Sequence, residues 1–383
     1  MPDIEAMKRR EFLKALTAGA ITLHAGSARA QPTETAESIY ERSISIDAMC
    51  FGAAPPRNYV TYLTKDKVEA LRHSGITALS MNMVSGEARL RGVACMFTEA
   101  QKMMREWDGF VAEHADVFTK VTDTAGLRSV KRSGKVGFIY NFQMSAPFGW
   151  DLAKIDVFHA MGVRQIQLIG GRRNFLADSC WEPTNAGLSQ YGYEVIEAFA
   201  DKGIIVDLSH VGEQSAHDAI QASTKPVIFS HSGCLALCPH PRNVSDRNIK
   251  AMAERGGVFC VYNQSGWLTK DPVISMDHFL AHVDRVIDIA GEDHVAFGSD
   301  QDAVDMTAMR PDEVERHQST FEKRRADYPE LDWEVKHMRV PELSHPKRLL
   351  HLAQAMHQRG YKTKTIEKIL GGNYVRVFEE VVG

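Results

Sequence analysis

The feature of this sequence that most constrains its fold is a series of short apolar runs that alternate with longer amphipathic segments. Eight such runs, rich in β-branched and aromatic residues, lie at 44–47, 76–79, 136–140, 165–168, 204–207, 227–229, 258–261 and 295–297. A run without polar alternation is typical of a strand that is buried on both faces of a parallel sheet. The segments between the runs favour helices at 193–202, 213–222, 246–255 and 276–290.

Eight strand–helix units in a chain of 383 residues predict an α/β fold of the (β/α)8 type, the TIM barrel. An open, doubly wound sheet is the alternative that the same alternation allows. No G-x-G-x-x-G motif follows the first run, which argues against a dinucleotide-binding sheet. We therefore expect one barrel domain over residues 31–383, with the highly charged stretch 310–338 as a solvated insertion after the eighth strand.

Residues 1–30 have the features of an export signal. Arg9 and Arg10 precede a modestly apolar run at 15–23, and Ala28-Arg29-Ala30 has the small-residue pattern that signal peptidase cleaves. The paired arginines resemble the twin-arginine signal of exported bacterial proteins. We expect the twin-arginine export machinery to carry the chain to the periplasm. An amphipathic helix that stays on the protein is the alternative.

The composition argues against two classes of partner. The chain has 45 Lys and Arg against 49 Asp and Glu, a net charge of −4, so it lacks the basic surface of a nucleic-acid-binding protein. No segment after residue 30 approaches the roughly 18–20 apolar residues of a membrane span. The six cysteines are too few to define a disulfide scaffold, and their pairing stays open.

Polar residues gather where the predicted strands end: Asp47, Gln143, His210, His231 and Asp300. In a parallel barrel these ends face the active site. His210 and His231 follow consecutive strands at the same depth, where neutral imidazoles would be good zinc ligands. Structural histidines are the alternative. Asp300 could accept a proton from a metal-bound water or hold a substrate ammonium.

Arg242 follows the His231 loop, in the sequence His240-Pro241-Arg242-Asn243. Its guanidinium could pair with a substrate carboxylate, because its planar donors match the two carboxylate oxygens. A surface salt bridge is the alternative. Trp181 and Glu182 lie after the fourth predicted strand, together with the pair Arg172-Arg173. We place these residues on the substrate side of the barrel.

The motifs and their order along the chain resemble those of the membrane (renal) dipeptidase family of (β/α)8 metallo-dependent hydrolases. The likeness spans nearly the whole chain after residue 30 and is densest at 203–211, 226–232 and 238–243, with further matches at 293–302 and 369–374. The resemblance implies hydrolysis of dipeptides or small amides, two zinc ions bridged by a glutamate, and a homodimer. It also implies that His210 and His231 bind one zinc ion, that Arg242 binds the substrate carboxylate, and that Asp300 is catalytic.

The chain differs from the family at the positions of the remaining zinc ligands. Met49 and Phe51 stand where the family has the His and Asp of an H-x-D motif, and Gln143 stands in place of the bridging glutamate. Gly170 falls where the family has a substrate-polarising histidine. A bridged pair of zinc ions needs anionic ligands that are missing here. We expect at most one zinc ion, and a metal-free site is the alternative.

These residues predict an exported, dipeptidase-like hydrolase of a dipeptide or small amide that bears a carboxylate. Two alternatives remain. One is a repurposed metal-free enzyme, and the other is a small-molecule-binding protein, in either case acting on a peptide-derived metabolite.

Overall fold

Parallel strands form the centre of the structure. The computed structural model describes residues 34–51, 63–84, 93–264, 266–271, 273–303 and 339–383. The segment 1–30 and the predicted insertion 310–338 lie outside these ranges. The strands are β1 (Ile46–Phe51), β2 (Ala78–Asn82), β3 (Phe118–Lys120), β4 (Val136–Phe142), β5 (Val163–Gln167), β6 (Ile205–Asp207), β7 (Ile228–Ser232), β8 (Val258–Val261), β9 (Val295–Phe297) and β10 (Gln301–Asp302).

Strand order confirms the predicted barrel. Neighbours in space run β10-β1-β2-β4-β5-β6-β7-β8-β9, every pair is parallel, and β3 lies beside β4. β9 pairs with β8, and β10, only three residues further on, pairs with β1. The segment that contains β9 and β10 therefore closes the sheet on itself, as the eighth strand of a (β/α)8 barrel does.

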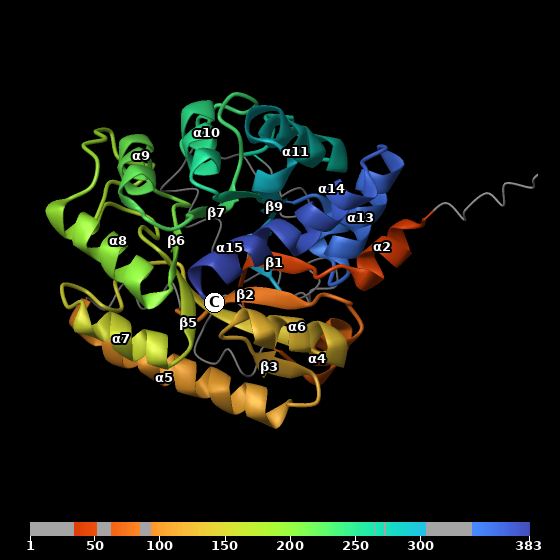
Figure 1. Ribbon diagram of the computed structural model, residues 1–383, viewed down its shortest axis with the longest axis horizontal. Helices are drawn as coiled ribbons and strands as arrows, with labels where there is room; N and C mark the ends of the chain where they lie inside the picture. Colours follow the sequence, from red (N-terminus) through yellow and green to blue (C-terminus); the bar gives the residue numbers. More distant parts are fainter. Residues whose placement is uncertain (1–33, 52–62, 85–92, 265, 272, 304–338) are drawn as a thin grey trace, which may run out of the picture. The chain divides into compact units, whose positions relative to one another are not determined.

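Helices surround the strands (Figure 1). They are α2 (Ala36–Arg42), α4 (Lys65–Arg72), α5 (Val93–Glu113), α6 (Thr124–Ser133), α7 (Ala153–Ala160), α8 (Gln190–Lys202), α9 (Glu213–Ala222), α10 (Asp246–Glu254), α11 (Met276–Ala290), α13 (Arg348–Gln358), α14 (Thr363–Glu367) and α15 (Asn373–Val381). Each of the eight predicted apolar runs overlaps a strand, and the four predicted helices coincide with α8 to α11 to within three residues. No helix in the described ranges is both long and apolar enough to cross a membrane.

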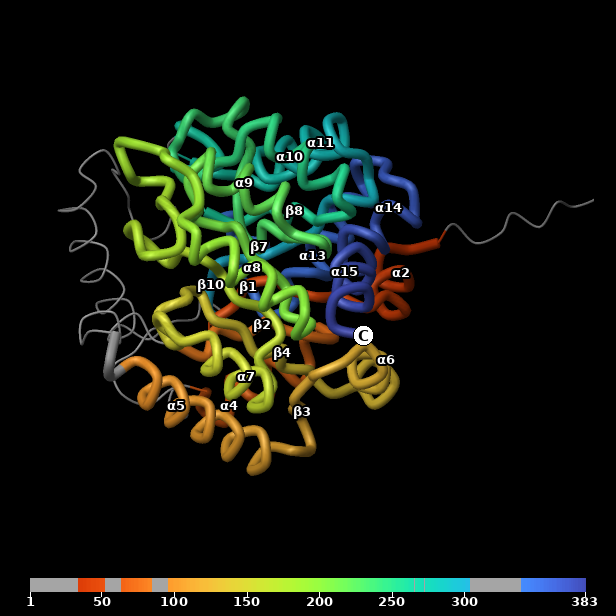
Figure 2. The backbone as a smooth tube through the Cα atoms, turned by 60° about the vertical axis from the view of Figure 1, so that its left-hand side comes forward, coloured from red at the N-terminus to blue at the C-terminus, as the bar shows by residue number. Residues whose placement is uncertain are grey.

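The end of the chain returns to its beginning. α13 packs against α2, and α15 lies near α6 (Figure 2). Tyr374, Val377 and Phe378 of α15 join a buried cluster with inward-facing strand residues such as Ile139 and Ile228. The hydroxyl of Tyr374 donates a hydrogen bond to Oε1 of Gln165, 2.7 Å away inside the barrel. α15 therefore fills one end of the barrel with apolar side chains, and the candidate site lies at the other.

Candidate functional site

Two histidines meet at the carboxyl ends of neighbouring strands. His231 belongs to β7 and is wholly buried, and His210 lies three residues beyond β6. Their Nε2 atoms are 3.0 Å apart. Nε2 of Gln143, which follows β4, is 3.5 Å from Nε2 of His231, and Oδ1 of Asp300 is 3.9 Å from it. The structure thus brings together four of the five polar residues that the sequence placed at strand ends.

Two of these residues have unusual backbones. His210 has φ of 68° and Asp300 has φ of 53°, and within the described ranges they are the only non-glycine residues with positive φ. This left-handed conformation costs about 1–3 kcal/mol for residues other than glycine. Specific contacts hold both backbones, since the carbonyl of His210 accepts from the amide of Cys180 at 2.9 Å and that of Asp300 from Nε2 of Gln264 at 3.0 Å. The rest of the fold therefore stabilises two strained backbones, and these backbones set the direction of the His210 and Asp300 side chains.

A buried hydrogen-bond chain orients His231. Its Nδ1 lies 2.7 Å from Oγ of Ser230, and that hydroxyl also contacts a carboxylate oxygen of Asp207. The other oxygen of Asp207 accepts from the amides of Ser209 and Ser230, at 3.0 and 3.1 Å. Burial raises the pKa of Asp207. Burial, and secondarily the nearby Arg242, lowers the pKa of His231 well below its usual value. Burial therefore favours the neutral form of His231, whose Nε2 lies beside Nε2 of His210.

Arg242 is a buried cation without a carboxylate partner among the described residues. Its side chain is fully buried, and Nη2 donates to the carbonyl of His231 at 3.0 Å. The guanidinium lies over the rings of Tyr262 and Trp267, 5.6 and 5.5 Å from their centroids. No described residue accepts a hydrogen bond from its Nε. Arg242 is thus not the surface salt bridge that the sequence left as the alternative.

Asp47, the fifth polar residue at a strand end, does not contact the histidine pair and instead bonds to Arg348. Asp47 of β1 is wholly buried and accepts hydrogen bonds from Nε of Arg348 and from the amide of Ser299, both at 2.8 Å. Its carboxylate therefore belongs to an internal ion pair. Met49, two residues on, is wholly buried and its carbonyl accepts from the amide of Asp300 at 3.0 Å, while Phe51 at the end of β1 is half-buried.

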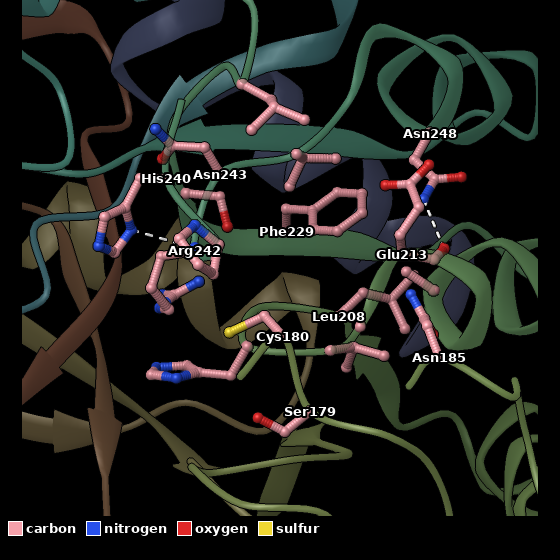
Figure 3. Close-up of a pocket in the computed structure, with 18 of the residues that line it drawn as sticks. Ser179, Cys180, Asn185, Leu208, Glu213, Phe229, His240, Arg242, Asn243 and Asn248 are labelled. Atoms are coloured by element: carbon pink, nitrogen blue, oxygen red, sulfur yellow. Dashed lines mark hydrogen bonds between the residues drawn. The ribbon is translucent and has the colours of Figure 1, made fainter. Parts of the chain in front are cut away.

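A pocket of about 230 Å³ adjoins the histidine pair (Figure 3). Arg242, His240 and Cys180 line one part of it, together with His210. The sequence pattern indicated His240 only as a neighbour of Arg242 in its motif and did not indicate Cys180. Of the residues placed on the substrate side, Glu182 lines the pocket, but Trp181, Arg172, Arg173 and the half-buried Gly170 do not. Arg173 instead forms an ion pair with Asp178.

The side chains at the histidine pair supply few of the donors that a metal ion needs. Within the described ranges, no three His, Cys, Asp or Glu side chains form a complete metal-binding group. The Nε2 separation of 3.0 Å in the histidine pair is near the roughly 3.3 Å expected for two nitrogens on one tetrahedral zinc ion. Asp300 is the carboxylate beside them, with its Oδ1 3.9 Å from Nε2 of His231, but these three side chains do not complete a metal-binding group. Met49, Phe51 and Gln143 stand in place of the family's anionic ligands, so the described residues do not supply the donors of a bridged pair of zinc ions.

The fold and this site define a (β/α)8 barrel protein of the hydrolase type, with its polar residues at the carboxyl ends of the strands. A family model described as "Membrane dipeptidase (Peptidase family M19)" matches residues 63–323. The chain therefore belongs to the membrane dipeptidase family, which confirms the resemblance drawn from the sequence.

Curated relatives share part of their length with this chain. It is 32% identical over 254 residues to dipeptidase tcpJ of Claviceps purpurea, covering 65% of this chain and 52% of that one. It is 28% identical over 299 residues to dipeptidase ataJ of Aspergillus terreus, covering 71% of this chain and 64% of that one. The chain thus spans about half to two thirds of these relatives.

Solved structures resemble it over nearly the whole length. An amidohydrolase from Pseudomonas aeruginosa is 26% identical, with a TM-score of 0.77 over 91% of this chain and 100% of that one. The probable dipeptidase PvdM from Pseudomonas aeruginosa is 18% identical, with a TM-score of 0.74 over 90% and 97%. A metallo peptidase from Rhodobacter sphaeroides, liganded with a phosphinate mimic of L-Ala-D-Ala, is also 18% identical, with a TM-score of 0.67 over 88% and 99%. The last two share the fold.

Proposed function

We propose that this protein hydrolyses dipeptides or small amides that carry a free carboxylate, and that Arg242 binds this carboxylate. The observation that supports the proposal is a buried guanidinium beside the histidine pair with no carboxylate partner among the described residues. A buried charge without a partner is costly. An anionic substrate would supply the missing charge, and a planar carboxylate suits the donors of an arginine.

We assign Asp300 as the general base of the proposed hydrolysis. It lies beside His231 and is held by Gln264, whose Nε2 donates to its Oδ2 at 3.1 Å and to its carbonyl at 3.0 Å. From this position its carboxylate would take a proton from the attacking water and return it to the leaving amine. His210 and His231, with Asp300 beside them, would hold one zinc ion. When bound, zinc lowers the pKa of water and polarises a carbonyl.

Arg242 can be tested through substrate binding. Arg242→Ala should raise KM for a dipeptide more than it lowers kcat, because the carboxylate contact is made in both the ground and transition states. Added guanidinium ions should restore part of the lost kcat/KM. Arg285→Ala, which removes a surface ion pair with Asp246, is the matched control. An unchanged KM in folded Arg242→Ala would contradict the assignment.

Metal content tests the second part of the proposal. We expect at most one zinc ion per chain by elemental analysis, and none in the double variant His210→Ala and His231→Ala. Two ions per chain would contradict our interpretation of Met49, Phe51 and Gln143. No ion, with activity unchanged by added zinc, would favour metal-free chemistry.

A second candidate function is binding without hydrolysis. The absence of a complete metal-binding group within the described ranges favours it, and Arg242 would serve it equally well. Calorimetry that detects a carboxylate ligand, together with no turnover of any dipeptide, would support this candidate.

We further propose that residues 1–30 direct export through the twin-arginine machinery to the periplasm, and that the mature protein is a homodimer. Paired Arg9→Lys and Arg10→Lys substitutions should retain the protein in the cytoplasm. A periplasmic fraction unchanged by these substitutions would contradict the first proposal, and a monomer in light scattering would contradict the second.

A further inference from the structure

Gln264 contacts both the backbone and the side chain of Asp300. Its Nε2 donates to the carbonyl oxygen of Asp300 at 3.0 Å and to Oδ2 of the same residue at 3.1 Å. A carbonyl oxygen can only accept, so the amide of Gln264 must present its NH2 group, which has one hydrogen for each of the two oxygens. Both hydrogens of this group therefore serve one residue.

The ends of β8 and β9 bring the two residues together. Gln264 lies three residues beyond β8, and Asp300 lies three residues beyond β9. The two strands pair in parallel, and the amide of Asn263 extends the pairing with a hydrogen bond to the carbonyl of Ser299 at 3.3 Å. Backbone contacts between neighbouring strand ends thus place Gln264 beside Asp300.

The double contact restricts the rotation of the Asp300 carboxylate. Because one nitrogen holds both the backbone carbonyl and Oδ2, the side chain cannot change its rotamer without breaking a hydrogen bond. Gln264 is buried, and a hydrogen bond from an amide to a carboxylate is strong where water is excluded. The other oxygen, Oδ1, lies 3.9 Å from Nε2 of His231, and 11% of the Asp300 side chain is exposed. The contact therefore keeps Oδ1 on the side of the histidine pair.

Other contacts hold the backbone of Asp300 but not its Oδ2. Its φ of 53° is rare for residues other than glycine. Nη1 of Arg339 also donates to the Asp300 carbonyl, at 2.8 Å, and the Asp300 amide donates to the carbonyl of Met49 at 3.0 Å. Removing the amide of Gln264 would leave these two backbone contacts in place and remove its contact with the carboxylate. We therefore expect such a change to affect the orientation of the side chain more than the fold.

We propose that Gln264 is a positioning residue, which holds the Asp300 carboxylate in one orientation and presents its Oδ1 to the attacking water. This inference rests on the proposed function and deepens it, because it assigns the oxygen through which the general base acts. Arg242 has other supports, since its guanidinium lies over the rings of Tyr262 and Trp267. Loss of the Gln264 amide should therefore leave the carboxylate-binding group in place.

A kinetic test separates positioning from substrate binding. Gln264→Met keeps the length of the side chain but has no donor. It should lower kcat for a dipeptide at least about tenfold and change KM less than about threefold, because a displaced base loses its alignment with the reacting atoms while Arg242 still binds the substrate. A smaller fall in kcat, or a rise in KM as large as the fall in kcat, in folded Gln264→Met would overturn the proposal.

Gln354→Met provides the control for this test. It removes an exposed glutamine whose Nε2 donates to a carboxylate oxygen of Glu37 at 2.7 Å, away from the candidate site. Both kinetic constants should stay at their wild-type values.

A second variant covers the case in which Gln264→Met does not fold. Gln264→Glu keeps the shape of the side chain but brings an acceptor to Oδ2 of Asp300 in place of a donor. It should lower kcat by at least about the same factor of ten. A smaller loss of kcat would overturn the proposal.

Crystal structures separate this proposal from the proposed hydrolysis. If the wild type cleaves no dipeptide, the hydrolytic function fails, but the orientation of Asp300 can still be compared between the wild type and the Gln264 variants. The carboxylate should occupy one rotamer in the wild type, and another rotamer or several in Gln264→Met or Gln264→Glu. Several rotamers in the wild type, or an unchanged single rotamer in the variants, would overturn the proposal.

Discussion

Asp47 and Arg348 form an ion pair inside the protein, although 301 residues separate them in the chain. Nε and Nη2 of Arg348 both lie 2.8 Å from Oδ2 of Asp47, and both side chains are wholly buried. Arg348 begins α13 and Asp47 lies in β1. The pair therefore attaches the last part of the chain to the first barrel strand, directly before the positions where the family has its first metal ligands.

Breaking this pair should destabilise the protein strongly. Arg348→Met leaves the Asp47 carboxylate buried without its cation, and such a loss typically costs about 3–5 kcal/mol. Chemical denaturation should detect it as a lower unfolding midpoint. The double variant Asp47→Asn with Arg348→Met should recover part of the loss, because no unpaired charge remains. A double variant no more stable than Arg348→Met would show that the packing of Arg348 matters more than its charge.

Ser230 should matter for metal binding through His231. Its hydroxyl lies between Nδ1 of His231 and Asp207, and loss of such a link typically weakens metal affinity by about 10–100-fold. Ser230→Ala should therefore raise the zinc dissociation constant, measured by competition with a chelator. Ser344→Ala removes a buried hydroxyl that donates to the carbonyl of Val340 and should leave zinc affinity unchanged. Equal effects of the two substitutions would remove Ser230 from this role.

Acid should destabilise the fold through buried neutral histidines. His282 accepts a hydrogen bond from the amide of Cys234 and contacts the carbonyl of Leu268, both at 2.8 Å. Burial lowers the pKa of His282 to about 4. Below the usual pKa near 6.5, His282 is protonated in the unfolded chain but stays neutral in the folded protein. The free energy of unfolding therefore falls as the pH drops from about 6.5 to about 4.

The contribution of His282 over that pH range is about 3 kcal/mol. His282→Gln should lower the unfolding free energy at pH 7. Between pH 6.5 and 4 it should also reduce the slope of the unfolding free energy against pH, by an amount that corresponds to about one proton. Denaturant titrations at several pH values would measure this. A slope equal to that of the wild type would mean that His282 does not titrate as described.

Gly298 should tolerate no side chain. It follows β9, and the Cβ of an alanine there would overlap the backbone carbonyl of Ser230 in β7. Gly298→Ala should cost at least about 3 kcal/mol, because two backbones would have to separate beside the candidate site. Gly109 in α5 has open space around it, so Gly109→Ala should be neutral or stabilising by up to about 1 kcal/mol. Thermal melts of the two variants compare these effects directly.

The sequence predicted the strands well, because strands buried on both faces have few polar residues and stand out as apolar runs. It also predicted that His210, His231, Gln143 and Asp300 lie together, since the ends of parallel barrel strands meet on one face. The partner of Asp47 could not be predicted, because no local pattern links β1 to Arg348. The place of Cys180 in the pocket lining could not be predicted either, because no sequence motif marks it and only the folded loop brings it there.

The closure of the barrel by β9 and β10 has a consequence for how the protein is made. The histidines occur by residue 231, but Asp300 lies in the closing segment, where its amide bonds to the carbonyl of Met49 and Gln301 aligns with Cys50. Synthesis must therefore pass residue 302 before the first strand can meet its last neighbour. A nascent chain released at residue 290 would contain both imidazoles and Arg242 and still lack the carboxylate beside them.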